Sequence, residues 1–174
     1  QTLRIEYELG RWTLQLNEYS KATAHFEKAI SLASQLAQTE LMVLSQMTHG
    51  LSLFMQGQPG RALANLEASA PKIEQYLGRG IDAVRAYSYL AMVRSQTGHG
   101  QDAAALGAQV ESWLAEGRSS QYAALFYHNF CASYILSWDL ETAVRLIGLC
   151  ESKTRDVPSF TFSCTVLDIA GWVQ

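Results

Sequence analysis

The chain of 174 residues repeats small amino acids at an interval of about 40 positions. One series has spacings of 40, 41, 40 and 40 positions and comprises Gly10, Gly50, Ala91, Cys131 and Gly171. A second series has spacings of 40, 41 and 40 positions and comprises Ala22, Ala62, Ala103 and Ala143. Two independent series with one period indicate an internal repeat. A period of this length is typical of solenoids and related repeat folds.

Each repeat has the sequence pattern of two amphipathic helices joined by a turn. Apolar residues at helical spacing predict first helices at residues 2–16, 40–56, 81–97, 119–137 and 159–174. The second helices are predicted at residues 18–37, 60–77, 100–117 and 139–154. Helix stops or N-caps are expected at Asn17, Gly57, Gly98 and Asp139. Pro71 lies inside a predicted second helix, and we expect it to kink or split that helix near residues 67–70.

The small residues are expected where the two helices of a hairpin cross. Gly, Ala or Cys at a crossing lets two helices approach to the short end of the ~8–10 Å packing range. The expected contacts are Gly10 with Ala22, Gly50 with Ala62, Ala91 with Ala103, and Cys131 with Ala143. A single hairpin cannot bury its apolar face, so the hairpins must stack into a solenoid.

We therefore expect one helical-repeat domain over residues 1–174. Its repeats are predicted at residues 2–38, 40–78, 81–118 and 119–157, followed by the first helix of a fifth repeat at 158–174. The chain starts at Gln1 and ends at Gln174 within a helical pattern. We interpret it as a fragment of a longer protein.

Composition narrows the class of protein and of partner. Hydrophobic residues make up 48% of the chain and charged residues 17%, which excludes disorder and favours a helix-rich soluble protein. The net charge is −3, so no basic field attracts phosphate backbones, and no nucleic-acid partner is expected. No apolar run approaches the ~20 residues needed to cross a bilayer, so no membrane partner is expected either.

The cysteines and histidines do not form a metal-binding pattern. Cys131, Cys150 and Cys164 match no metal-site spacing and leave an odd thiol, so reduced thiols in a cytoplasm are the simplest interpretation. His128 and Cys131 share one helix face, but no second pair converges on them, and a structural role is the preferred interpretation. We expect no metal, no cofactor and no catalytic residue.

Other titratable residues fit ordinary helix amphipathicity. His49 is expected to pack in the hairpin interior, and Glu6 to lie on a solvated face. Lys21, His25 and Lys28 are expected to form the polar side of one helix.

Part of each repeat resembles the tetratricopeptide-repeat signature. Leu9-Gly10, Tyr19, Ala22, Phe26 and Ala29 carry the resemblance in the first repeat. The later repeats retain Gly50, Gly57, Ala62, Leu66, Leu90, Gly98, Ala103 and Ala143. The period differs, because that family repeats every 34 residues. The aromatic residues of the first repeat are also replaced later in the chain. Pro59 and Gly100 stand at the position of Tyr19, and Gly107 stands at the position of Phe26. The resemblance implies an all-α, right-handed α-solenoid of antiparallel hairpins with about nine helices.

A second resemblance covers most of the chain. His49-Gly50, Phe54, Gly57, Arg61-Ala62, Leu66-Glu67, Leu90-Ala91, Gly98 and Ala170-Gly171-Trp172 carry it. These residues are similar to the helical-repeat region of large bacterial signalling ATPases, which also carry nucleotide-cyclase or DNA-binding domains. The resemblance implies a cytoplasmic signal-transduction protein. No phosphate-binding Gly-x-x-x-x-Gly-Lys-Ser/Thr loop is present, so no ATPase activity is expected from these 174 residues.

In tetratricopeptide solenoids the first helices line a concave binding face. The corresponding candidate residues here are Arg4, Tyr7, Arg11, Leu44, Met47, Leu51, Phe54, Arg85, Met92 and His128. Methionine and aromatic side chains on such a face suit adaptable partner binding. The alternative is that these residues are buried by superhelical curvature or by other domains.

Two functions follow as hypotheses. The first is a non-enzymatic protein-interaction or regulatory scaffold that binds a protein, a peptide or another domain of its own chain. The alternative is a small-molecule effector-sensing domain. An enclosed pocket would favour sensing, and an open apolar groove would favour protein docking. Exposed terminal helices also offer a surface for dimerisation.

Overall fold

The structure is a computed structural model that describes residues 1–115, 127, 130–131, 134–135 and 139–154. Every regular element among these residues is a helix. The chain divides into two compact units, residues 1–78 and 79–174. The predicted all-α class is confirmed for the described residues.

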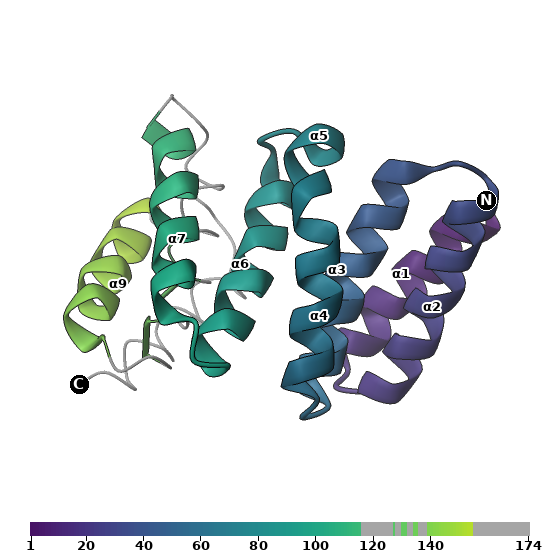
Figure 1. Ribbon diagram of the computed structural model, residues 1–174, viewed down its shortest axis with the longest axis horizontal. Helices are drawn as coiled ribbons and strands as arrows, with labels where there is room; N and C mark the ends of the chain where they lie inside the picture. The colour runs from purple at the N-terminus through teal and green to yellow at the C-terminus, as the bar shows by residue number, and fades with distance from the viewer. Residues whose placement is uncertain (116–126, 128–129, 132–133, 136–138, 155–174) are drawn as a thin grey trace. The chain divides into compact units, whose positions relative to one another are not determined.

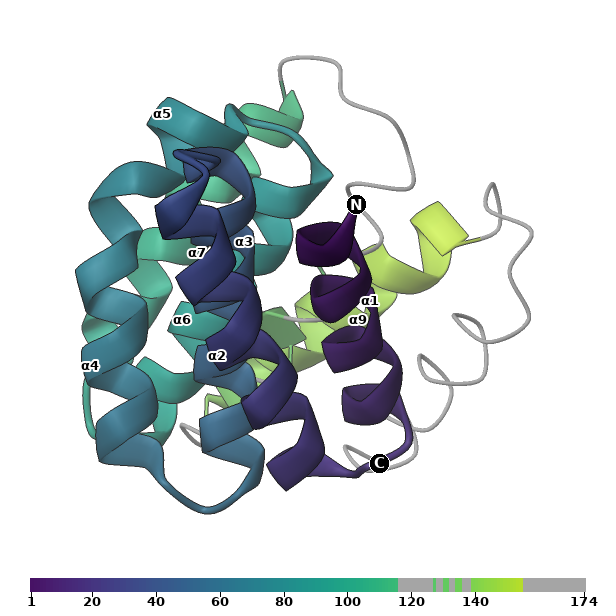
Figure 2. The same ribbon diagram turned by 90° about the vertical axis from the view of Figure 1, so that its right-hand side faces the viewer.

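The first unit is built from two helical hairpins (Figures 1 and 2). Its elements are α1 (Thr2–Gln15), α2 (Tyr19–Gln35), α3 (Thr39–Met55), α4 (Pro59–Ser69), the 3-10 segment η1 (Ala70–Lys72) and α5 (Ile73–Leu77). Successive helices pack on one another, α1 on α2, α2 on α3, and α3 on α4. Each helix therefore covers an apolar stripe of its neighbour, which is how helical repeats form a continuous core.

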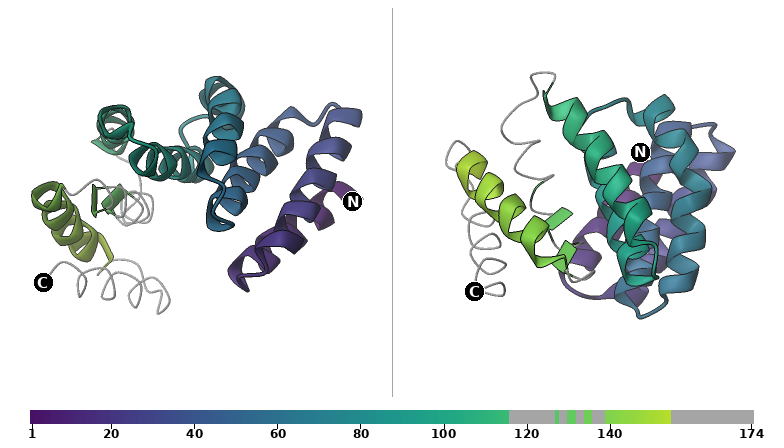
Figure 3. Two further views of the ribbon diagram at one scale, coloured as in Figure 1. Left: turned by 60° about the horizontal axis from the view of Figure 1, so that its bottom comes forward. Right: turned by 60° about the vertical axis from the view of Figure 1, so that its left-hand side comes forward.

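The second unit contains a hairpin of the same kind, drawn in teal and green in Figure 3. Its elements are α6 (Ile81–Gln96), α7 (Gly100–Ala115) and α9 (Leu140–Thr154). The described residues of the helix predicted at 119–137 are helical. The backbone N–H of Thr142 donates to Asp139 Oδ1 at 3.1 Å, which confirms Asp139 as the N-cap of α9. The helix predicted at 159–174 lies outside the described residues.

Pro71 splits the second helix of the second repeat, as predicted. Helix α4 ends at Ser69, the 3-10 segment η1 contains the proline, and α5 begins at Ile73. Proline has no N–H to donate, and its ring crowds the carbonyl four residues earlier.

The turns inside the hairpins also follow the sequence. Asn17, Gly57 and Gly98 adopt left-handed backbone conformations, with φ of 60°, 74° and 85°. Beyond one of these turns, the Gln58 N–H donates back to the Leu53 carbonyl at 3.0 Å. This bond satisfies a carbonyl at the end of α3, as in the common glycine-type helix stop. The predicted stops at these three positions are confirmed.

Ala37, which ends α2, has the same left-handed backbone without being glycine or asparagine. Its φ is 52°, and the following Gln38 N–H donates to the Ala33 carbonyl at 2.9 Å. A Cβ atom disfavours this conformation by roughly 1–2 kcal/mol. Replacing Ala37 with glycine is expected to raise the free energy of unfolding by about 0.5–1 kcal/mol in urea denaturation, after the entropy of the unfolded glycine is subtracted.

The matched control for Ala37→Gly is Ala24→Gly, in an exposed interior position of α2. There glycine is expected to lower the free energy of unfolding by about 1 kcal/mol. Destabilisation by both substitutions would contradict the left-handed turn at Ala37.

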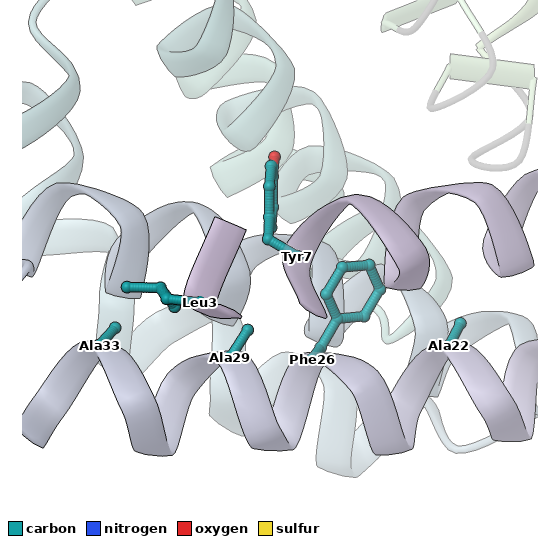
Figure 4. Close-up of a cluster of buried hydrophobic side chains, with 6 residues drawn as sticks. All are labelled: Leu3, Tyr7, Ala22, Phe26, Ala29 and Ala33. Atoms are coloured by element: carbon teal, nitrogen blue, oxygen red, sulfur yellow. The ribbon is translucent and has the colours of Figure 1, made fainter. Parts of the chain in front are cut away.

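The core of the first hairpin shows how α1 and α2 meet. Ala22, Phe26, Ala29 and Ala33 follow one face of α2 and point toward α1, which contributes Leu3 and Tyr7 (Figure 4). The Tyr7 and Phe26 rings are 6.2 Å apart and tilted by 56°, a favourable geometry for an aromatic pair.

The side chains nearest to Gly10 and Gly50 lie one helical turn beyond the alanines expected to face them. A Cβ atom added to Gly10 would lie 2.6 Å from Phe26 Cε1, and one added to Gly50 would lie 2.5 Å from Leu66 Cγ. The glycines therefore accommodate Phe26 and Leu66. The expected contacts with Ala22 and Ala62 stay predictions. Helical side chains lean toward the N-terminus of their helix. A large residue one turn after each alanine therefore covers the surface at the alanine's level.

The fourth repeat keeps the expected pairing. Cys131 Sγ lies 3.6 Å from the Ala143 carbonyl oxygen, and both residues are buried. This contact confirms that Cys131 faces Ala143. The contact of Ala91 with Ala103 stays a prediction, although both residues are buried.

Candidate functional site

The candidate binding residues of the first unit come from α1 and α3, which contact each other. Arg4 is exposed and Arg11 is half-buried on α1. Leu44, Leu51 and Phe54 are half-buried on α3. We call these five residues the candidate surface. It is a mixed surface, with three apolar side chains from one helix and two guanidinium groups from the other.

Two of the residues expected on this surface belong to the core. Tyr7 is 7% exposed and Met47 is 1% exposed. Tyr7 packs in the cluster that contains Leu3 and Phe26, with Leu44 against its edge. Helix α3 is packed by α1, α2, α4 and α5, which leaves little of its circumference open. The expectation that Tyr7 and Met47 line an open groove is therefore corrected.

The charge of Arg11 is partly compensated. Its Nη1 lies 3.1 Å from Glu8 Oε2, and its guanidinium carbon lies 5.8 Å from the centre of the Tyr7 ring. A half-exposed ion pair of this type contributes little to stability. The pair and the ring together hold the guanidinium at a defined place, with part of its surface open to solvent.

The second unit supplies the other candidate residues. Arg85 and Met92 are half-buried on α6. Arg85 Nη1 lies 2.7 Å from Asp82 Oδ1, one turn earlier on the same helix. His128 lies outside the described residues.

A polar cluster between α2 and α3 was not anticipated from the sequence. Ser52 Oγ donates to the Tyr19 carbonyl at 3.0 Å and lies 2.8 Å from Thr23 Oγ1. Gln56 Nε2 donates to the same carbonyl at 3.2 Å and also to Thr23 Oγ1. These bonds join the second helix of one repeat to the first helix of the next, so they fix the register of stacking. Only an alignment of the repeats onto each other could have indicated that Ser52 and Gln56 face α2.

Glu6 also has a role that the sequence did not indicate. His25 Nδ1 lies 2.7 Å from Glu6 Oε2, and Lys28 Nζ lies 3.6 Å from Glu6 Oε1. The hydrogen bond with His25 lowers the pKa of Glu6 below its usual value, with a smaller contribution from the charge of Lys28. We expected Glu6 and His25 on solvated helix faces. That expectation is wrong, because their side chains join α1 to α2. Lys21 and Lys28 are exposed, as expected.

His49 packs in the interior, as expected. It is 9% exposed, and neither ring nitrogen makes a hydrogen bond among the described residues. The nearest carboxylate oxygen, Glu27 Oε1, lies 3.8 Å from Nε2. The nearby Asn65 amide donates instead to the Gln46 carbonyl at 2.6 Å.

The described residues offer little for metal or thiolate chemistry. Among them, no three His, Cys, Asp or Glu residues are grouped so that they could hold a metal ion. Cys131 and Cys150 are buried. Burial raises the pKa of Cys131 to about 12, so this thiol is protonated at neutral pH and is a poor nucleophile.

Comparison with known proteins supports the fold. The chain is similar to the crystal structure of a protein from Podospora anserina described as a kinesin light chain with nearly identical TPR-like repeats. The TM-score is 0.67 at 17% sequence identity, and the match covers 98% of this chain and 92% of the other. The fold is therefore an α-solenoid of TPR-like helical repeats.

Searches by sequence gave no match. No protein-family model matches the chain, and no curated protein matches it. Within the described residues, no helix is long and apolar enough to span a membrane.

Proposed function

We propose that this chain is a non-enzymatic protein-interaction module whose first unit binds a protein or peptide partner. The observation that carries the proposal is the candidate surface on α1 and α3. Its apolar members Leu44, Leu51 and Phe54 are half-buried on α3, and Arg4 and Arg11 supply positive charge on the contacting helix α1. Apolar anchors bordered by charged groups are typical of protein-binding surfaces.

The architecture supports this use of the surface. Helical repeats hold side chains of successive first helices on one continuous face, so an extended partner can contact several repeats. The surface needs no loop closure to form, because its residues lie on helices whose neighbours fix them. A partner that combines apolar side chains with carboxylates would match the three apolar residues and the two arginines.

The wider context of the proposal is a signalling protein. The resemblance to the repeat regions of bacterial signalling ATPases supports a role in which this module regulates an effector domain, in a cytoplasm that keeps Cys131 and Cys150 reduced. Effector sensing is the alternative. If a small molecule binds the purified chain and substitutions on the candidate surface leave its affinity unchanged, that result would favour effector sensing.

The test places a photoreactive phenylalanine analogue at position 54 in cells that make the protein. We expect a covalent adduct with one partner, whose affinity for the purified chain is then measured by calorimetry. Phe54→Ala is expected to weaken that affinity at least tenfold, because truncating a central aromatic anchor typically costs about 2 kcal/mol or more.

The matched control is Leu36→Ala, which truncates an apolar side chain that is 59% exposed and lies outside the candidate surface. It is expected to leave the affinity unchanged. Equal affinity of the wild-type chain and of the Leu51→Ala and Phe54→Ala variants would refute docking on this surface.

A further inference from the structure

The connection between the two compact units uses a backbone conformation that belongs to glycine. The first unit ends at Gly78, and the second begins at Arg79. Gly78 has φ of 60° and ψ of −142°. A Cβ atom makes this combination strongly unfavourable, whereas glycine adopts it at little cost. The chain therefore passes from one unit to the other through a residue with unusual backbone freedom.

The end of α5 at Gly78 differs from the other helix ends at positive φ. After Ala37, Gly57 and Gly98, the next N–H donates to the carbonyl five residues earlier, at 2.9, 3.0 and 2.8 Å. Such bonds close a helix end, and they require the left-handed helical region, where ψ is about +47°. With ψ of −142°, the N–H after Gly78 is turned away from the end of α5. This helix end therefore lacks the geometry of the closing bond.

The residues on both sides of Gly78 are anchored, each within its own unit. Before it, Ile73 of α5 is fully buried, and α5 packs on α3. After it, the guanidinium carbon of Arg79 lies 5.4 Å from the centre of the buried Trp113 ring. The Gly80 carbonyl accepts the first hydrogen bond of α6 at 3.1 Å. Rotation of the backbone is therefore least restrained at Gly78.

The side chains that orient one repeat on the next inside the first unit are replaced in the following repeat. The hydroxyl oxygens of Thr23 on α2 and Ser52 on α3 lie 2.8 Å apart. The equivalent positions of α4 and α6 hold Leu63 and Val93. Neither side chain can form a hydrogen bond, and apolar burial is not directional. These positions of α4 and α6 therefore cannot supply the bond that orients α3 on α2.

We propose that Gly78 is a hinge about which helices α1 to α5 rotate relative to α6 and α7. Hinges typically consist of a few residues at the ends of elements that absorb large changes in φ and ψ. A repeat scaffold with such a hinge can present its two units to a partner at different angles. The hinge uses no residue of the candidate surface, so it is independent of the docking function proposed above.

Distances between two nitroxide labels in the complete 174-residue chain test the proposal. The labels are attached to p-acetylphenylalanine, so the native cysteines are not modified. One pair replaces Lys28 and Ala64, which are exposed on α2 and α4 of the first unit. The other pair replaces Lys28 and Ala108, which is exposed on α7, and so spans Gly78. Pulsed electron spin resonance is expected to give a distance distribution about twofold wider for the second pair, as a population of several hinge angles requires.

Gly78→Ala shows whether this residue is the source of the motion. A Cβ at Gly78 would meet no atom within 4 Å, so the substitution acts on the backbone alone. The distance distribution across Gly78 is expected to narrow and its mean to shift, because alanine disfavours the present conformation and has fewer alternatives. The matched control is Gly60→Ala, where a Cβ also meets no atom within 4 Å but φ is not positive. It is expected to leave both distributions unchanged.

Two results would overturn the hinge. The first is an equal width for the two label pairs in the protein with native Gly78, a comparison that does not depend on the folding of any glycine variant. The second is a wide distribution across Gly78 whose width and mean are unchanged by Gly78→Ala, because the motion would then arise elsewhere in the chain. Circular dichroism checks that Gly78→Ala retains its helix content.

Discussion

Replacing Gly10 with alanine is expected to lower the free energy of unfolding by about 1–3 kcal/mol, as for other overpacked cores. The added Cβ would lie 2.6 Å from Cε1 of Phe26, whose side chain is fully buried. Real Cβ atoms do not approach that closely, so the ring or one of the helices must move. Alanine is also the better helix former by about 1 kcal/mol. The measured change in stability therefore shows whether overpacking against Phe26 outweighs helix propensity. Urea denaturation followed by circular dichroism measures the difference.

The matched control is Gly60→Ala in the same unit. A Cβ at Gly60 would meet no atom within 4 Å. Helix propensity then acts alone, and stability is expected to be unchanged or to rise by up to about 1 kcal/mol. A rise of the same size for Gly10→Ala would show that α1 and α2 are farther apart than described.

A double-mutant cycle shows whether Phe26 is the cause. Phe26→Leu removes part of the ring that blocks the new methyl group, so Gly10→Ala is expected to cost less in that background. The two substitutions should therefore be coupled by more than the 0.5 kcal/mol within which independent sites usually add.

The repeat explains why most of the fold could be predicted from the sequence. The helix predicted at residues 18–37 spans Tyr19–Gln35, and that predicted at 40–56 spans Thr39–Met55. Boundaries were predictable because turn residues such as Asn17 and Gly57 require special backbone conformations. The contacts across each hairpin were harder to predict from the sequence. The direction in which Phe26 leans is a property of the helix, not of the spacing of small residues.

The candidate site was predicted less well, for a different reason. Helical spacing places Leu44, Met47 and Leu51 on one side of α3, but burial depends on how many other helices surround that side. Met47 is in the core, whereas Leu51 is only half-buried. Similarly, Leu9 and Trp12 are exposed on α1, whereas His49 and Ser52, the equivalent residues of α3, are buried.

His49 provides the second large effect, because its buried ring makes the stability of the first unit depend on pH. Burial lowers the pKa of His49 below its usual 6.5, with Glu27 opposing the shift and Arg61 adding to it. The unfolded chain therefore binds this proton at higher pH than the folded chain does. Stability is fully present above about pH 6.5 and is lost as the pH falls from there toward the folded-state pKa. One such group contributes up to about 1.4 kcal/mol per pH unit within that window.

His49→Leu is expected to remove this pH dependence and to stabilise the chain at neutral pH by about 1–2 kcal/mol. Two buried nitrogens without hydrogen-bond partners disappear, and an unsatisfied buried polar atom costs about 1–3 kcal/mol. Leucine suits the position, because Leu9 and Leu90 occupy it in neighbouring repeats and Leu90 is fully buried.

Urea denaturation at pH 7.5, 6.5 and 5.5 tests this prediction by comparing the wild type, His49→Leu and the control His99→Gln. His99 is exposed in a turn, so its replacement should leave the pH profile as steep as in the wild type. All groups other than His49 contribute equally to the wild type and His49→Leu, and the difference between their profiles therefore isolates the buried ring. Parallel profiles for these two proteins would mean that His49 reaches solvent or a hydrogen-bond partner in the folded chain.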